Sequence, residues 1–235
     1  MTGQLSRQKR LPVLLVIGYF VFLLQAAAWA DSPVQNSGKT TSMIDLNAEE
    51  QQTVQAHEIL VRERPTNGQP GKTFEAVAIM EAGREVIRDI VMDYPSYPDF
   101  MPNVSRIEIL AQDENTALLN QTLSLPLGKI KKYRIKLEAS EPDEQTSLIQ
   151  WQLQPWPELK PEETIRDTTG FWRIEELDAA RSLVLYHVST DPGKVPFGLG
   201  WIVDILSKDS VPDVVTKTRE RAERVRALLK AQEQQ

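Results

Sequence analysis

The chain of 235 residues contains no cysteine and only two histidines, His57 and His187. The absence of cysteine excludes disulfide bonds, catalysis by a thiolate and cysteine-based metal sites. No carboxylate accompanies the two histidines at a recognisable ligand spacing, so the sequence does not indicate a metal site. We therefore predict neither a metal nor a cofactor.

The sequence also lacks the motifs of common catalytic and nucleotide-binding sites. It has no Gly-x-Ser-x-Gly elbow, no Gly-x-Gly-x-x-Gly turn and no phosphate-binding loop. Its formal net charge of −6 is unfavourable for nucleic acid, because such binding depends on neutralising phosphates. Neither histidine has a nucleophile beside it, so we assign them surface or structural roles and predict no catalytic residue.

The first thirty residues have the pattern of a secretory signal peptide. Arg7, Lys9 and Arg10 precede an apolar stretch, 11–24, and Ala28-Trp29-Ala30 supplies a small-x-small cleavage pattern. We predict cleavage after Ala30 and a periplasmic or secreted protein. The alternative is a retained N-terminal membrane anchor, because residues 11–30 just reach the length of a spanning helix. No cysteine follows the apolar stretch, which excludes a bacterial lipid anchor.

Composition divides the rest of the chain into a tether, a folded domain and a short tail. Residues 31–54 are rich in Ser, Thr, Asn and Gln without apolar periodicity, which predicts a flexible tether ending in a short helix near 46–52. We place one folded domain over 55–230 and a disordered tail over 231–235.

Periodicity within 55–230 predicts an α+β fold. Extended runs over 57–64 and 72–80 flank a turn rich in proline and glycine, which is typical of a hairpin. Apolar spacing predicts a helix over 83–93, and alternation predicts strands over 104–112, 117–125, 130–139, 147–154, 169–177 and 182–190. An apolar helical stripe recurs from 199 to 229, with a break at 209–212, and predicts terminal helix packed on the sheet.

A proline-rich segment, 94–102, lies between the first helix and the strand that follows it. Its three prolines prevent a continuous helix, and its three aromatic side chains favour burial. The passage from Ile87 to Leu110, with Tyr97-Pro98-Asp99-Phe100-Met101-Pro102 at its centre, resembles the START-like or SRPBCC superfamily of polyketide cyclases, plant pathogenesis-related allergens and coenzyme-Q-binding proteins. This resemblance implies the helix-grip fold, in which a curved antiparallel sheet wraps round a long C-terminal helix and leaves an apolar cavity.

The resemblance and the strand alternation together identify candidate ligand-binding residues. The apolar and aromatic candidates are Phe100, Leu123, Leu125, Tyr133, Ile135, Trp151, Trp172, Tyr186, Phe197, Trp201 and Ile205. The candidate polar contacts are Asn120, Gln121 and Arg134. The alternative is that these side chains fill a solid core. The segment 195–201 is either a gate at the cavity mouth or an ordinary connector to the helix.

Three functions are compatible with these features. The first is an exported protein that binds a hydrophobic small molecule such as a lipid, an isoprenoid quinone or an aromatic metabolite. The second is a cyclase or dehydratase, which the resemblance permits but which needs an inward-facing acid–base pair that the sequence does not show. The third is a protein-interaction module with a filled core, because a fold alone does not determine a function.

One basic cluster stands out in this acidic chain: Lys129, Lys131, Lys132, Arg134 and Lys136. These charges could make transient contact with an anionic membrane surface. The alternative, which we favour, is that they protect an exposed strand face against aggregation. We expect the protein to be a monomer.

Overall fold

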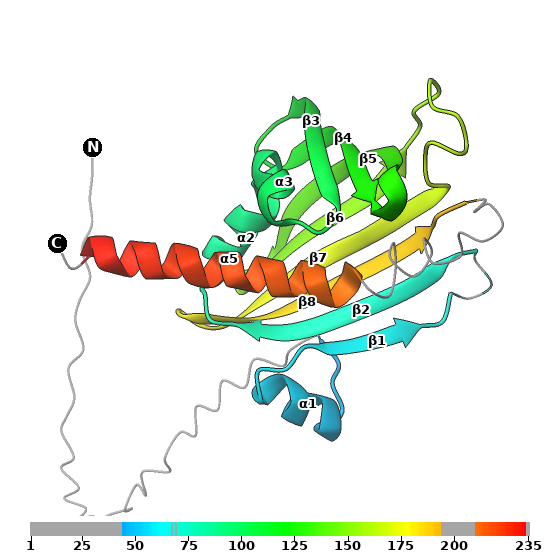
Figure 1. Cartoon of the computed structure of the whole chain (residues 1–235). Helices are drawn as coiled ribbons and strands as arrows, with labels where there is room; N and C mark the ends of the chain where they lie inside the picture. The colour runs from blue at the N-terminus through cyan, green and yellow to red at the C-terminus, as the bar shows by residue number, and fades with distance from the viewer. Residues whose placement is uncertain (1–43, 67, 69, 194–209, 234–235) are drawn as a thin grey trace, which may run out of the picture. The chain divides into compact units, whose positions relative to one another are not determined.

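The computed structural model describes residues 44–66, 68, 70–193 and 210–233, all within the unit that spans 42–235. Eight strands of this part of the chain form one antiparallel sheet in the order β1-β2-β8-β7-β6-β5-β4-β3 (Figure 1). The strands are β1 (Leu60–Arg64), β2 (Lys72–Met80), β3 (Val104–Gln112), β4 (Thr116–Leu125), β5 (Lys129–Asp143), β6 (Thr146–Gln154), β7 (Asp167–Asp178) and β8 (Arg181–Asp191). The helices are α1 (Ala48–Gln55), α2 (Arg84–Met92), α3 (Tyr97–Phe100) and α5 (Ser210–Glu233), with 3-10 turns η1 (Tyr94–Ser96) and η2 (Pro126–Gly128). The α+β, helix-grip fold class predicted from the sequence is confirmed.

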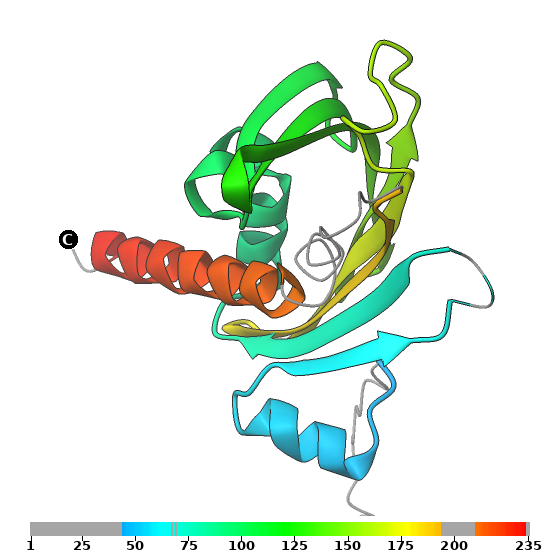
Figure 2. The ribbon, with the colours of Figure 1, turned by 45° about the vertical axis from the view of Figure 1, so that its right-hand side comes forward.

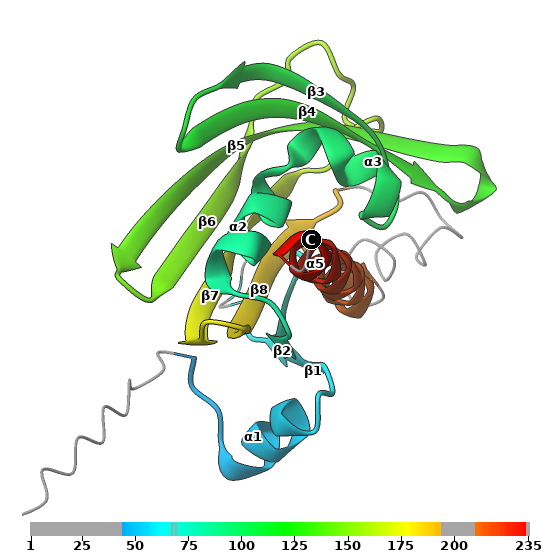
Figure 3. The same ribbon diagram turned by 90° about the vertical axis from the view of Figure 1, so that its left-hand side faces the viewer.

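The sheet curves round one end of the long helix α5, as Figures 2 and 3 show. Alternation along the strands decides which side chains face this concave side. In β5, for example, Ile135 and Leu137 are buried in the core, whereas Lys136 between them pairs with Glu138 on the other face. The pairing of β3 with β4 shifts register twice, and such bulges bend a sheet locally.

The segment between α2 and β3 folds as two short helical turns with buried aromatic rings. α2 buries Ile87, Ile90 and Val91 on one face and ends at Met92. The prolines at positions 95 and 98 then lie in the first turns of η1 and α3, where a missing N–H costs little. The rings of Tyr94, Tyr97 and Phe100 pack edge to face in sequence, with centroids 5.7 and 5.6 Å apart. The predicted burial of this segment is therefore confirmed.

The terminal helix α5 is attached to the sheet by an apolar stripe and by arginines. Val211, Val215 and Ala222 are buried at helical spacing. Arg221 donates to Asp93, which follows α2, at 2.8 Å, and Arg226 donates to the carbonyl oxygen of Glu81 at 2.8 Å. The buried stripe holds α5 against the sheet, and these part-exposed contacts also connect the helix to the ends of α2 and β2.

The helix α1 packs on the opposite face of the sheet from α5. Its Val54, together with Ile44, joins a second apolar cluster with residues of β2 and β8. A capping box in which Asn47 accepts from the backbone of Glu50, and Glu50 accepts from that of Asn47, stabilises its first turn. The sequence analysis assigned residues 31–54 to a flexible tether that ends in a short helix near 46–52. The structure has that helix as α1, but it packs Ile44 and Val54 against the sheet, so this part of the segment is not a flexible tether. The physical reason is that β2 buries both of its faces, so its outer face needs a cover.

A charged cluster lies beside α1 on this outer face. Glu75 accepts hydrogen bonds from Arg62 at 2.8 Å and from Arg64 at 2.7 Å, and His187 Nδ1 lies 3.1 Å from its other oxygen. Burial opposes the charge of Glu75, but the hydrogen bonds from His187, Arg64 and Arg62 lower its pKa to about 2. Arg62 also donates to Glu50 of α1 at 3.0 Å. The cluster therefore links three strands and the helix.

Among the residues that the structure describes, no helix is long and apolar enough to cross a membrane. The same residues hold no group of three or more His, Asp or Glu side chains arranged to bind a metal ion.

Candidate functional site

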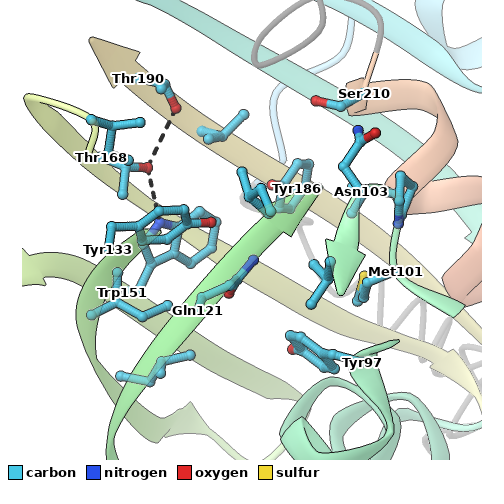
Figure 4. A pocket seen from close by; sticks show the side chains of 18 of the residues that line it. Tyr97, Met101, Asn103, Gln121, Tyr133, Trp151, Thr168, Tyr186, Thr190 and Ser210 are labelled. Atoms are coloured by element: carbon cyan, nitrogen blue, oxygen red, sulfur yellow. Dashed lines mark hydrogen bonds between the residues drawn. The ribbon is translucent and has the colours of Figure 1, made fainter. Parts of the chain in front are cut away.

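A pocket lies on the concave side of the sheet, between its strands, the α3–β3 connection and the first turns of α5 (Figure 4). Its cavity volume is about 130 Å³. Among the described residues, its lining consists of Tyr97, Met101, Pro102, Asn103, Val104, Gln121, Leu123, Tyr133, Ile135, Leu137, Trp151, Ile165, Thr168, Trp172, Tyr186, Val188, Thr190, Ser210 and Val214. No Lys, Arg, His, Asp or Glu is part of this described lining, so the pocket wall is apolar with neutral polar groups.

Three aromatic side chains from neighbouring strands form one wall of the pocket. The rings of Trp151 and Tyr186 stack with centroids 5.7 Å apart, and those of Trp172 and Tyr186 lie 4.5 Å apart. Trp151 lies directly opposite Gly170 in the pairing of β6 with β7. A Cβ built at Gly170 would lie 2.3 Å from the Trp151 ring. The ring can therefore occupy this position only because residue 170 has no side chain.

A short line of hydrogen bonds runs along the same wall. The indole N–H of Trp151 donates to the hydroxyl of Thr168 at 3.4 Å, and that hydroxyl lies 3.3 Å from the hydroxyl of Thr190. These contacts, dashed in Figure 4, join β6, β7 and β8 at the pocket. They hold the Trp151 ring in a fixed orientation toward the pocket.

Four other polar side chains of the lining have no side-chain hydrogen bond with a described residue: the amides of Asn103 and Gln121 and the hydroxyls of Tyr133 and Tyr186. Gln121 is 8% exposed, and it lies directly opposite Tyr133 in the pairing of β4 with β5. Burial raises the pKa of Tyr133 and of Tyr186 well above the ordinary value of 10.0, so both hydroxyls keep their protons near neutral pH. Tyr97 differs, because its hydroxyl donates to the carbonyl oxygen of Val91.

Seven of the residues predicted from the sequence come together in this lining. They are Leu123, Tyr133, Ile135, Trp151, Trp172 and Tyr186 among the apolar candidates and Gln121 among the polar ones. Phe100 and Leu125 are buried in the core, but they do not line the pocket. Phe100 instead packs against Tyr97 and lies 4.7 Å below the guanidinium of Arg221. Phe197, Trp201 and Ile205, with the segment 195–201, lie outside the described residues.

Asn120 and Arg134 do not line the pocket, in contrast to the prediction. They are opposite each other on β4 and β5, and Arg134 Nε donates to Asn120 Oδ1 at 2.9 Å. Arg134 also lies 5.1 Å above the ring of Trp156. Strand alternation explains this arrangement. Because Gln121 and Tyr133 point inward, Asn120 and Arg134 beside them in the chain point to the other face of the sheet.

The sequence analysis did not identify several lining residues, and four of them carried a usable signal. Leu137 on β5, Thr168 on β7 and both Val188 and Thr190 on β8 continue the inward-facing alternation of the identified residues on those strands. The others are Tyr97, Met101, Pro102, Asn103, Val104, Ile165, Ser210 and Val214. Several of these lie at the α3–β3 connection or on α5, and only the packing of those elements brings them to the strands.

The basic cluster is divided between the two faces of β5. Lys131 is buried, and its ammonium donates to the carbonyl oxygens of Glu162 at 2.9 Å and Thr164 at 2.7 Å. Burial lowers the pKa of this lysine. Lys136 pairs with Glu138 on the outer face. These side chains have local partners, which favours a structural interpretation of the cluster.

The two histidines lie away from the pocket. His187 contacts Glu75 on the outer face, with its ring stacked 4.8 Å from that of Phe171. His57 lies 4.0 Å from Glu81, near the end of β2. An acid–base pair directed into the pocket, on which a cyclase or dehydratase depends, is therefore not among the described lining residues.

A family profile described as polyketide cyclase / dehydrase and lipid transport matches residues 80–218. The match begins at the end of β2 and ends within α5, so it includes all of the described pocket lining. No protein of curated function matches the sequence.

Solved structures of low sequence identity share the fold. The STAR-related lipid transfer protein from Xanthomonas axonopodis is 18% identical, with a TM-score of 0.59 over 70% of this chain and 93% of that chain. Human STARD10 is 13% identical, with a TM-score of 0.61 over 74% of this chain and 72% of that chain. The Zhui aromatase/cyclase from Streptomyces sp. R1128 is 15% identical, with a TM-score of 0.52 over 72% of this chain and 98% of that chain. At these identities the likeness shows the fold alone.

Proposed function

The chain belongs to the polyketide cyclase / dehydrase and lipid transport family, whose profile covers more than half of it, and from this premise we propose that it binds a hydrophobic small molecule in the pocket beside α5. The observation that carries the proposal is the lining itself, in which aromatic and aliphatic side chains surround a space without a charged group among the described residues. A lipid, an isoprenoid quinone or an aromatic metabolite would suit such a wall.

Burial of apolar surface would supply the affinity. Each Å² of apolar ligand surface removed from water contributes about 25 cal/mol, so a ligand that buries ~200 Å² would gain roughly 5 kcal/mol before the costs of binding. The wall of Trp151, Tyr186 and Trp172 would provide much of this contact area. The polar groups of the lining would orient the ligand without adding a large share of the affinity.

Native mass spectrometry of the protein purified from its own cells tests this function. We expect an additional bound mass on the wild-type protein, which extraction and chromatography would identify. Leu123→Trp would fill the pocket, because Leu123 is one of its buried lining residues, and should abolish the additional mass. Ser124→Trp is the matched control, because Ser124 is exposed on the same strand and should leave the additional mass unchanged.

Two outcomes would contradict the proposal. A wild-type protein without any bound small molecule would favour the interaction module with a filled core. Retention of the bound mass by a folded Leu123→Trp variant would show that the ligand lies elsewhere. Conversion of the extracted molecule by the purified protein would instead support the cyclase or dehydratase alternative on the same pocket.

We further propose that the protein is exported and that its leader is removed. The basic residues Arg7, Lys9 and Arg10, the apolar stretch 11–24 and the small residues Ala28 and Ala30 support this proposal. The intact mass of the protein from its own cells should correspond to a chain that begins at Asp31. A mass that includes residues 1–30 would instead support the N-terminal membrane anchor.

A further inference from the structure

The amide of Gln121 faces the pocket and makes no hydrogen bond with any described residue. Gln121 is 8% exposed and lines the pocket, and its amide atoms are not among the buried polar atoms that lack both a partner and access to solvent. A ligand that fills the pocket would remove this amide from water, and an amide buried without a partner destabilises the complex. A ligand with a hydrogen-bonding group would avoid that cost, whereas a purely apolar ligand would not.

Two hydroxyls share the pocket with this amide. Tyr133 lies directly opposite Gln121 in the β4–β5 pairing, and Tyr186 comes from β8, in the aromatic wall. Figure 4 shows Gln121, Tyr133 and Tyr186 around the same space. Neither hydroxyl has a hydrogen-bond partner among the described residues. An amide and two phenols together can both donate and accept, which is the requirement for binding a hydroxyl or a carbonyl group.

The same lining is unsuited to an ionised group. Its described residues include no Lys, Arg or His, so a carboxylate or phosphate would lose its hydration without gaining a counter-ion. Lys131, the buried lysine near this end of β5, donates to the carbonyl oxygens of Glu162 and Thr164 and does not line the pocket. The polar group of a ligand that enters here should therefore be neutral.

We infer that the ligand carries an uncharged hydroxyl or carbonyl group, which hydrogen bonds to Gln121 and to the hydroxyls of Tyr133 and Tyr186. This inference rests on the proposed function, because it specifies the chemistry of the molecule that the pocket holds. It assigns Gln121 as the residue that selects for the polar group. The apolar part of the ligand then lies against the aromatic wall.

Four probes with one ring skeleton separate these requirements: naphthalene, 2-naphthol, 2-acetonaphthone and 2-naphthoate. Their dissociation constants with the delipidated protein would be measured by isothermal titration calorimetry. We expect 2-naphthol and 2-acetonaphthone to bind about tenfold more tightly than naphthalene, which is the effect of a buried hydrogen bond. The carboxylate of 2-naphthoate should make it the weakest ligand that carries a polar group.

Substitutions assign the preference to the named side chains. Gln121→Leu should narrow the difference in affinity between 2-naphthol and naphthalene, because 2-naphthol loses a hydrogen-bond partner and naphthalene no longer buries an unpaired amide. Gln152→Leu is the matched control, because Gln152 is an exposed glutamine of β6 that is not part of the lining. Tyr133→Phe and Tyr186→Phe each remove one oxygen and keep the ring, so they still test the inference if Gln121→Leu does not fold.

The outcomes distinguish this inference from the proposed function. If all four probes bind with similar affinity, or if 2-naphthoate binds most tightly, the inference is wrong and the proposed function stands. If Gln121→Leu and both tyrosine variants keep the preference for 2-naphthol, these side chains do not hold the polar group. If no probe binds and the native protein carries no small molecule, the proposed function fails and the inference fails with it.

Discussion

Gly170 is the position at which one added carbon atom should most strongly disturb the pocket wall. A Cβ built there would lie 2.2 Å from the carbonyl oxygen of His187 and 2.3 Å from Cζ2 of Trp151. Contacts below 3.0 Å are essentially never seen for real Cβ atoms, so Gly170→Ala must displace the β8 backbone, the Trp151 ring, or both. The Trp151 ring lines the pocket and the β8 backbone is paired with β7, so moving either one would disrupt the pocket wall or the strand pairing.

The expected cost follows from the rigidity of these two neighbours. Overpacking a core by one carbon costs about 1–3 kcal/mol, and we expect the upper end because one obstacle is backbone. For a domain of about this size each kcal/mol lowers the unfolding midpoint by roughly 2–4 °C. Gly170→Ala should therefore lower Tm by about 6–12 °C, as measured by far-UV circular dichroism. Its affinity for 2-naphthol should fall as well, because the Trp151 ring moves.

A double-mutant cycle separates the two obstacles. In a Trp151→Leu background the indole atoms are absent, so Gly170→Ala should cost less than it does in the wild-type protein, by roughly 1 kcal/mol. Gly83→Ala is the control, because a Cβ there approaches only the carbonyl oxygen of Ala179, at 3.0 Å. A Gly170→Ala protein with an unchanged Tm and unchanged probe affinity would refute the described packing of Trp151 on β7.

Two further predictions concern the outer face of the sheet. Because Glu75 has a pKa of about 2 in the folded protein against an ordinary 4.5, its charge stabilises the fold above pH 4.5, and this stabilisation is lost as pH falls from 4.5 toward 2. Glu75→Gln should therefore lower the unfolding free energy, measured by urea titration, by about 3 kcal/mol at pH 7 and by much less near pH 2. An equal difference at both pH values would show that the charge of Glu75 is not the cause of the stabilisation. The double variant Lys132→Gln, Arg134→Gln should leave cosedimentation with anionic vesicles unchanged, since Arg134 is already held by Asn120. A loss of cosedimentation would support the membrane-contact alternative.

Much of the pocket wall could be predicted because the strands that form it alternate clearly. Large apolar residues alternate from Tyr133 to Leu137 in β5 and from Ile149 to Leu153 in β6, so Tyr133, Ile135 and Trp151 could be placed on the inner face from their spacing. The same spacing places Arg134 on the outer face, where the structure has it. The prediction that Arg134 contacts the ligand was wrong because it ignored this alternation.

The strand β4 alternates less clearly in its middle. Leu118 and Leu119 are two adjacent apolar residues followed by two adjacent polar ones, Asn120 and Gln121, so these four residues alone do not choose a face. The alternation of Leu123 and Leu125 with polar residues, extended back along the strand, places Gln121 on the inner face and Asn120 on the outer one, but both were selected as polar contacts. The pairing of Gln121 with Tyr133 in the structure agrees with that alternation.

Taken alone, the sequence determined the order of the elements, the α+β class, the family resemblance and most of the aromatic wall, because these depend on local periodicity and on a short motif. The tertiary structure decided which polar groups meet in the pocket. Gln121, Tyr133 and Tyr186 come from β4, β5 and β8, and β8 is separated from β5 in the sheet by β6 and β7. Their shared space arises from the curvature of the whole sheet, which is a property of all eight strands packed together and has no local signature in the chain.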